Sequence, residues 1–143
     1  MGQTTFTGPM KTGTIREGSA KNTGTVVTAQ TGAWVQSTTA AAVGDIVIPA
    51  NSQILEIQIT VTTAPEAGNI SVGTSATATE LFTALAAGTS ANVFLFGSAA
   101  TITDADTWAD VGTSDVTIYA DASAGTTGRG FITVTYIQGI NNA

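Results

Sequence analysis

The feature that most constrains this chain is an alternation of apolar and polar residues within Gln53–Thr63, QILEIQITVTT. The apolar Leu55, Ile57, Ile59 and Val61 alternate with the polar Glu56, Gln58, Thr60 and Thr62. Successive side chains of a strand point to opposite faces, so a period of two predicts a strand with one buried face. The run therefore predicts a β-strand that belongs to a sheet.

Other segments repeat this signal over shorter lengths. Seven further strands are predicted: Thr25–Gln30, Ala33–Thr38, Asp45–Ile48, Asn69–Val72, Asn92–Phe96, Asp115–Ala120 and Arg129–Gln138. In the last of them, Ile132, Val134 and Tyr136 are expected on the inward face. Asn92–Phe96, NVFLF, is apolar on both faces and predicts a fully buried central strand.

One segment favours a short helix. In Thr79–Ala87, Leu81 and Leu85 are four residues apart, and Thr79 is able to cap the first turn. We expect this helix to be an excursion between two strands.

Composition supports a β protein. Thr, Ile and Val supply 51 of the 143 residues, whereas Leu supplies only 4. Branching at Cβ disfavours helix and suits a pleated surface. Turn residues around Pro49, Pro65, Gly73 and 124–128 separate the predicted strands. Together these patterns predict an all-β antiparallel sandwich over residues 25–143, a jelly roll of about eight strands. The large apolar residues are few for this length, which favours a homo-oligomer.

Charge divides the chain unevenly. Residues 1–21 hold three basic side chains and one acidic one, for a net charge of +2, whereas 22–143 sum to −8. Residues 1–24 have too few clustered apolar residues to fold alone and predict an extended N-terminal arm. Its Lys11, Arg16 and Lys21 form either a solvated tail or a docking arm for an acidic neighbour. An acidic body with one Arg argues against nucleic acid as a partner.

The residue inventory argues against catalysis. Cys and His are absent, which removes thiol nucleophiles, imidazole bases and the usual zinc ligands. We therefore expect no enzyme, no catalytic residues, no cofactor and no small-molecule substrate.

One acidic segment invites two hypotheses. Asp104, Asp106 and Asp115 fall at positions one, three and twelve of a calcium loop, but Trp108 and Ala109 occupy positions five and six, where a ligand and a glycine belong. Asp104 and Asp106 also have the spacing of a carboxylate pair for glycoside hydrolysis. A surface loop without bound metal is the favoured interpretation.

Aromatic and apolar residues give two further expectations. Trp34, Trp108, Tyr119 and Tyr136 are expected in the core, with a sugar-binding face as the alternative. No apolar run approaches the length of a membrane helix, and residues 1–20 contain no apolar targeting segment. No membrane partner is expected, and the protein is either intracellular or assembled inside a cell.

Three segments resemble the head decoration (cement) proteins of tailed phages. Residues 48–73, IPANSQILEIQITVTTAPEAGNISVG, resemble a strand pair opened by a proline turn, and GRGFITVTYI at 128–137 resembles the closing strand. GPMKTGTIREG at 8–18 is similar to the extended N-terminal arms of this group.

The resemblance implies a jelly-roll homotrimer on the outer surface of an icosahedral capsid, assembled in the host cytoplasm. Such a trimer bridges major capsid subunits at threefold junctions, and Lys11, Arg16 and Lys21 would be its arm contacts. The alternatives are a phage tail or fibre module, and a carbohydrate-binding module that exposes Trp34 or Trp108.

Overall fold

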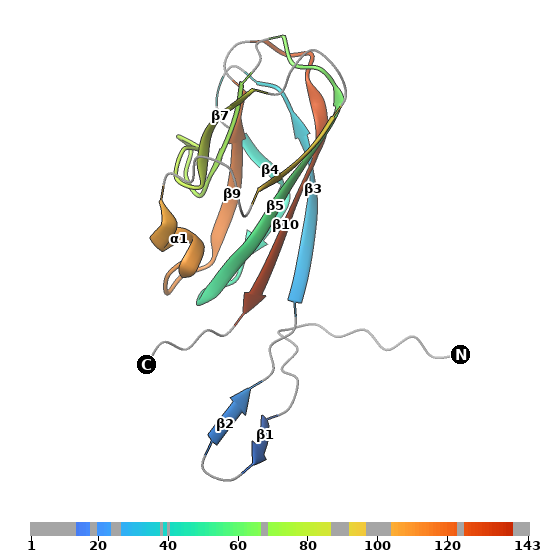
Figure 1. Cartoon of the computed structure of the whole chain (residues 1–143). Helices are drawn as coiled ribbons and strands as arrows, with labels where there is room; N and C mark the ends of the chain where they lie inside the picture. The colour runs from blue at the N-terminus through green and yellow to red at the C-terminus, as the bar shows by residue number, and fades with distance from the viewer. Residues whose placement is uncertain are drawn as a thin grey trace, which may run out of the picture.

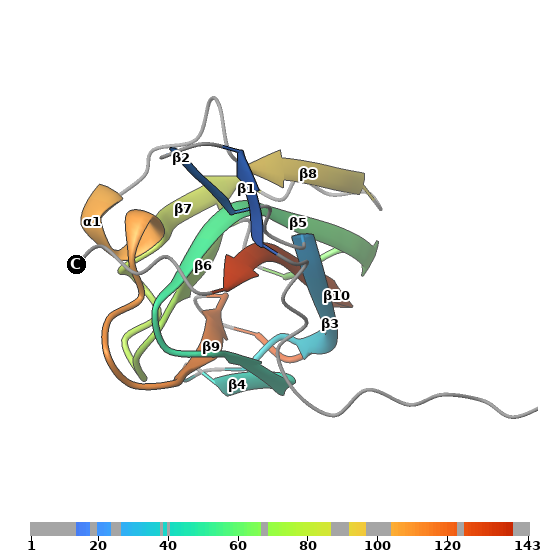
Figure 2. The same ribbon diagram turned by 90° about the horizontal axis from the view of Figure 1, so that it is seen from below.

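The computed structural model describes residues 14–17, 20–23, 27–37, 39, 41–66, 69–86, 92–96, 104–122 and 125–138. Its elements, in chain order, are β1 (Thr14–Glu17), β2 (Ala20–Thr23), β3 (Val27–Val35), β4 (Ala41–Ile48), β5 (Ser52–Thr63), β6 (Asn69–Gly73), β7 (Phe82–Ala86), β8 (Asn92–Phe96), α1 (Ala105–Ala109), β9 (Val116–Asp121) and β10 (Arg129–Gln138). The strands β3 to β10 form two layers, with the short α1 at one end beside β5 (Figures 1 and 2).

The two layers are four-stranded antiparallel sheets with the orders β3-β10-β5-β8 and β4-β9-β6-β7. Among the eight strands from β3 to β10, the first pairs with the last, the second with the seventh, the third with the sixth and the fourth with the fifth. One long hairpin folded over into two sheets gives these pairs, which is the topology of a jelly roll. The predicted all-β sandwich is therefore confirmed.

Aliphatic side chains from both sheets fill the space between the layers. The buried core combines Ile57, Ile59 and Val61 of β5 with inward residues of the second sheet such as Ile46, Ile70 and Ile118. On β10 the predicted inward residues Ile132, Val134 and Tyr136 are all buried. The prediction that alternate residues lie inward is confirmed along these stretches, because each sheet buries one face against the other.

The predicted alternation of β5 breaks at Leu55. Thr135 of β10 pairs with Glu56, and Tyr136 pairs with Ile54, which leaves Leu55 without a cross-strand partner. Such an extra residue is a β-bulge, and it reverses the inward-outward pattern beyond it. Ile54 is 3% exposed and Leu55 is 39% exposed. The prediction that Leu55 lies on the inward face is wrong for this reason.

Two predicted strands are one continuous strand. The predictions Thr25–Gln30 and Ala33–Thr38 are replaced by β3, which runs through Gly32 without a turn. A Cβ on Gly32 would lie 2.8 Å from the carbonyl oxygen of Val43 on β4. This glycine therefore permits a close approach between two strands instead of marking a turn.

The helix predicted at Thr79–Ala87 is wrong. Phe82–Ala86 forms β7, which pairs with β6. Leu81, which precedes β7, and Phe82, its first residue, are both buried in the core. A nine-residue helix gains little by itself in water, so the sheet pairing prevails.

The position predicted for Asn92–Phe96 is also wrong. β8 pairs with β5 and stands at the end of its sheet instead of the centre. An apolar run predicts that two faces of a strand are covered. An apolar run does not specify how many neighbouring strands pair with the strand, so it cannot distinguish a central strand from one at the end of a sheet.

Candidate functional site: an outward sheet face

The basic residues predicted as arm contacts are placed only in part. Lys11 lies outside the described residues. β1 and β2 form an antiparallel pair of their own, in which Arg16 stands directly opposite Lys21. Directly opposite residues are neighbours across the pair, so two of the three basic positions are brought together. Sequence reasoning placed them on one extended segment and did not predict this pairing.

A more extensive surface lies on the outward side of the sheet β3-β10-β5-β8. We call it the β3–β10–β5 face. Its residues, read from the strand register and the alternation of burial, are Val27, Ala29, Thr31, Ala33 and Val35 on β3; Arg129, Phe131, Thr133, Thr135 and Ile137 on β10; and Gln53, Leu55, Glu56, Gln58, Thr60 and Thr62 on β5. Small, hydroxyl and apolar side chains dominate this face.

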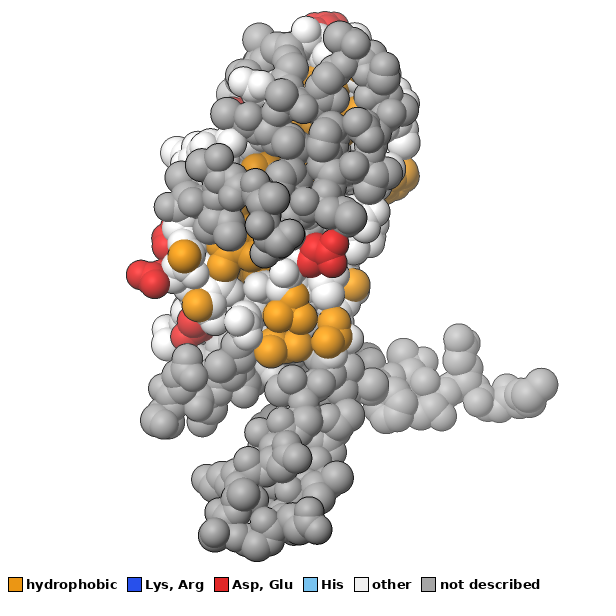
Figure 3. Space-filling model, viewed as in Figure 1, with side chains coloured by type: hydrophobic (Ala, Val, Ile, Leu, Met, Phe, Trp, Pro, Cys, Tyr) orange, Lys and Arg blue, Asp and Glu red, His pale blue; other side chains and the backbone are white. Residues whose placement is uncertain are grey.

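Exposed apolar side chains gather on this face. Among the described residues, five large hydrophobic side chains are exposed, and four belong to it: Val27, Val35, Leu55 and Phe131. Phe131 is 49% exposed and lies between Ala33 and Thr60, its partners on the two neighbouring strands. Figure 3 shows a group of hydrophobic side chains at the end of the sandwich where β5 begins and β10 ends. An aromatic ring in the middle of an open sheet is a feature of contact surfaces.

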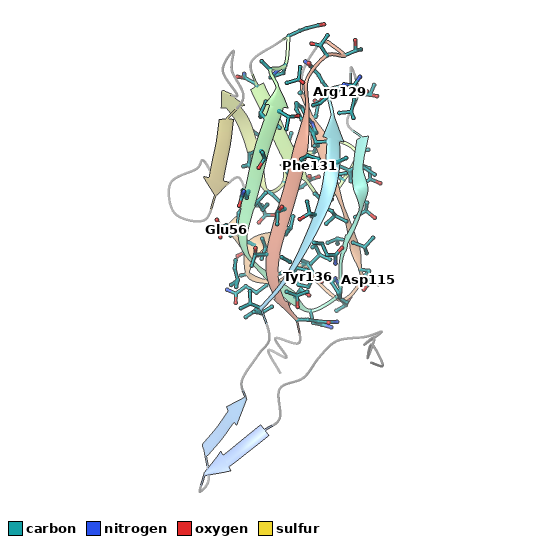
Figure 4. All side chains as sticks on the ribbon, turned by 90° about the vertical axis from the view of Figure 1, so that its right-hand side faces the viewer. Glu56, Asp115, Arg129, Phe131 and Tyr136 are labelled. Atoms are coloured by element: carbon teal, nitrogen blue, oxygen red, sulfur yellow. The ribbon has the colours of Figure 1, made fainter. Side chains whose placement is uncertain are left out.

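The face is nearly free of charge. It carries one acidic residue, Glu56, and one basic residue, Arg129, at different levels of the sheet, with Phe131 at a level between them (Figure 4). Its polar side chains bind one another: the Thr31 and Thr133 hydroxyl oxygens are 2.8 Å apart, and Gln58 Nε2 lies 3.4 Å from Thr60 Oγ1. Hydroxyls that are already paired cost less to remove from water.

Two glutamine side chains hold the edge strand of this face in place. The Gln30 amide bonds both main-chain groups of Val47 on β4, donating to the carbonyl oxygen at 2.7 Å and accepting from the N–H at 3.1 Å. At the other end of β3, buried Gln36 accepts from the N–H groups of Glu66 and Gly128, each at 3.0 Å. Sequence reasoning missed both, because nothing in an isolated glutamine indicates its main-chain partners.

The acidic segment at 104–110 is part of the fold. The predicted loop contains α1, and Asp104 is its N-cap, accepting from the N–H groups of Asp106 and Thr107. Hydrogen bonds from the Thr107 side chain and main chain lower the pKa of Asp104. Trp108 Nε1 donates to the Leu81 carbonyl at 3.0 Å and attaches the helix to the core. Within the described ranges, no three acidic side chains are grouped as a metal site would require.

A second carboxylate organises the connection between β6 and β7. Glu80 accepts from the hydroxyls of Ser75 and Thr77 and from the N–H groups of Thr74 and Thr79. Burial raises the pKa of Glu80, but the hydrogen bonds, that from Ser75 first, outweigh it, so the pKa lies below its usual value. This carboxylate stabilises the connection between β6 and β7.

The aromatic residues lie mainly in the core. Trp34 is 2% exposed and Trp108 is 7% exposed, and Tyr136 is also buried, whereas Tyr119 is half-buried. The core prediction is confirmed for the first three. A sugar-binding face built on Trp34 or Trp108 has no exposed indole to use. In the described part of the chain, no helix has the length and apolar character needed to cross a bilayer.

No protein-family model and no curated protein matches the sequence. Solved structures do share the fold. A chain in the capsid of Ralstonia phage GP4 has a TM-score of 0.57 and 20% identity, covering 81% of this chain and 86% of that one. A chain in the cyanophage Pam1 capsid asymmetric unit has a TM-score of 0.50 and 18% identity, covering 87% and 94%.

A third chain, in the acid-stable capsid of Helicobacter pylori bacteriophage KHP30, has a TM-score of 0.50 and 16% identity, covering 78% and 87%. At such identities the likeness establishes the fold. This sandwich is thus an architecture that occurs in phage capsids.

Proposed function

We propose that the protein is a structural component of a phage virion. It binds the outside of an icosahedral capsid as a homotrimer at threefold junctions and stabilises contacts between major capsid subunits. The observation that carries this proposal is the jelly roll itself, which chains of three phage capsids share over most of their length and most of this chain. The resemblance of residues 8–18, 48–73 and 128–137 to head decoration proteins supports the finer assignment.

The proposed mechanism is adhesion without catalysis. A junction between capsid subunits exists only in the assembled shell, so a protein that binds there stabilises that state by mass action. The sandwich is acidic and the N-terminal arm is basic, which gives the arm a means to dock on acidic shell subunits through Lys11, Arg16 and Lys21. The carboxylates Glu80 and Asp104 hold turns and caps, consistent with a scaffold role.

Binding to undecorated heads tests the proposal. The full chain is mixed with heads that lack it, and bound protein is measured after sedimentation of the particles. We expect saturable binding at threefold positions and a rise in the temperature at which the heads open. A variant that lacks residues 1–24 is expected to bind at least tenfold more weakly. Absence of binding by the full chain contradicts the function, and equal binding by the shortened variant contradicts the arm mechanism.

The charge of the arm is tested separately. Replacing Lys11, Arg16 and Lys21 together by glutamine is expected to weaken binding and reduce its dependence on salt. The matched control exchanges Lys for Arg and Arg for Lys at the same positions, which keeps the charge and should keep the affinity. If the glutamine variant binds as tightly as the control, the three charges are not the contacts.

Trp34 and Trp108 are both buried, so neither offers the exposed indole that the carbohydrate-binding alternative needs. No observation favours a tail or fibre module over the capsid role. Sedimentation of the isolated protein tests the trimer, and a monomer at all concentrations counts against the decoration role.

A further inference from the structure

The β3–β10–β5 face differs in charge from the remainder of the sandwich. Residues 22–143 sum to −8, and their one basic residue, Arg129, lies on this face. The face itself is neutral, since Arg129 is balanced by Glu56. Two copies of an acidic protein repel each other through most of their surfaces. Contact through this face avoids that repulsion.

The two charges of the face stand at different levels along β10. Glu56 is the cross-strand partner of Thr135, which lies six residues along β10 from Arg129. At about 3.4 Å per residue, the two charges stand about 20 Å apart along the strand. Among the described residues, neither Glu56 nor Arg129 has an ion-pair partner on its own chain. The level halfway between them is that of Ile132.

We propose that this face docks on the same face of a second copy about a twofold axis. The axis lies in the plane of contact at the level of Ile132 and runs across the strands. Such a rotation brings Arg129 of one copy over the Thr135–Glu56 row of the other, and it forms the second such pair by symmetry. It also brings Phe131 over the partner's row of Thr31 and Thr133, whose hydroxyls are already paired with each other.

The composition of the face favours another sheet as the occupant. Outward Ala, Thr and Val side chains are short, so two such faces can approach at the spacing of about 10 Å found between stacked sheets. Three strands of about ten residues cover about 14 by 33 Å. This area belongs to the small class of specific interfaces, so the contact is expected to be weak and concentration-dependent.

This inference goes beyond the proposed function and does not depend on it. A twofold contact doubles a monomer, and it doubles a trimer when its axis crosses the threefold axis. Failure to bind undecorated heads would leave the twofold contact in place. Loss of the twofold contact would leave binding through the arm in place.

Reciprocal charge reversal tests the proposal. The full chain, Glu56→Arg and Arg129→Glu are compared by analytical ultracentrifugation at up to about 100 µM, because contacts of this size are weak. The full chain is expected to reach twice the mass of either variant. Each variant places like charges opposite each other at both pairs. An equimolar mixture of the two variants restores both opposite-charge pairs and is expected to regain the doubled mass.

Two further variants complete the test. Glu66→Arg changes the net charge as Glu56→Arg does, but Glu66 lies in the exposed connection after β5 and is not one of the residues of the face, so this variant should associate like the full chain. Phe131→Ser removes the central ring without changing charge and should associate more weakly with unchanged thermal unfolding. Equal masses for the full chain and both reversed variants overturn the proposal, as does a mixture that fails to regain mass. Loss of head binding by Glu56→Arg without any change in mass would assign the face to a capsid subunit and also overturns it.

Discussion

The two sides of the strands β3, β10 and β5 are built from alternate residues of the same segments, yet one side is buried and aliphatic whereas the other is exposed and largely polar or small. The inward side carries Ile57, Ile132 and Val134, all fully buried. The outward side carries Thr, Ala and Gln with an exposed Phe131. The inward side supplies the free energy of folding. The outward side contributes little to the core and is available for contact with other molecules.

Polar side chains show the same contrast. Gln36 points inward and accepts from two main-chain N–H groups of distant connections. Gln58 points outward and makes one long contact with Thr60, two residues away. A buried acceptor cannot be replaced by water, whereas an outward one can. The same residue type is therefore expected to matter on one side and not on the other.

The largest expected effect tests the bulge in β5. Ile54→Ala removes a buried side chain and should lower the free energy of unfolding by about 3 kcal/mol. Leu55→Ala, one residue away, should lower it by about 0.5 kcal/mol or less, because Leu55 faces water. Urea unfolding measures both. Equal losses would mean that the register of β5 is not the one described.

The next effect tests the inward glutamine. Gln36→Leu leaves the N–H groups of Glu66 and Gly128 without their acceptor and should cost about 2 kcal/mol. Gln58→Leu is the matched control on the outward side and should cost about 0.5 kcal/mol or less. Thermal or urea unfolding of both variants gives the comparison. A neutral Gln36→Leu would show that water satisfies these groups.

The smallest effect concerns a partly enclosed carboxylate and depends on pH. Glu80→Gln removes the negative charge but keeps an amide oxygen that can accept from the N–H groups of Thr74 and Thr79, so it weakens charge-assisted hydrogen bonds at a cost of about 1 kcal/mol at pH 7. The pKa of Glu80 is lowered by folding, so its contribution is present above its unfolded pKa and is lost as pH falls through the folded value.

The stability difference between the wild type and Glu80→Gln should therefore shrink as the pH is lowered from 7 to below the ordinary glutamate value of 4.5. Urea unfolding at several pH values measures it, with the exposed Glu66→Gln as the control. A difference that stays constant down to pH 3 would mean that the hydrogen bonds to Glu80 do not favour its ionised form.

Local pattern predicted the strands well where each buried one face. Ile132, Val134 and Tyr136 lie inward as the alternation requires. Predictions from the local pattern were wrong where pairing with a neighbouring strand determines the direction of a side chain or the type of secondary structure. Leu55 is turned outward by a bulge against β10, and Gly32 lies within a strand because β4 approaches it closely. Thr79–Ala87 has helical spacing, but pairing with β6 makes Phe82–Ala86 a strand.

Of the two candidate contact regions, one could be predicted from the sequence and the other could not. The basic residues of the N-terminal segment are visible in the sequence, because charge can be counted without a fold. The β3–β10–β5 face is not visible there, because its rows join residues about 100 positions apart, as Ala33 joins Phe131. Leu55 does not differ from a core residue until the register is known.

The sequence by itself determined the class of this protein. Its β-branched residues and period-two runs require sheets, its lack of Cys and His disfavours the common catalytic chemistries, and its charge separates a basic segment from an acidic body. The tertiary structure decided the strand order, the bulge, the strand in place of a helix, and which exposed residues share a face. The physical reason is that alternation and charge are local properties, whereas pairing depends on residues that only the folded chain brings together.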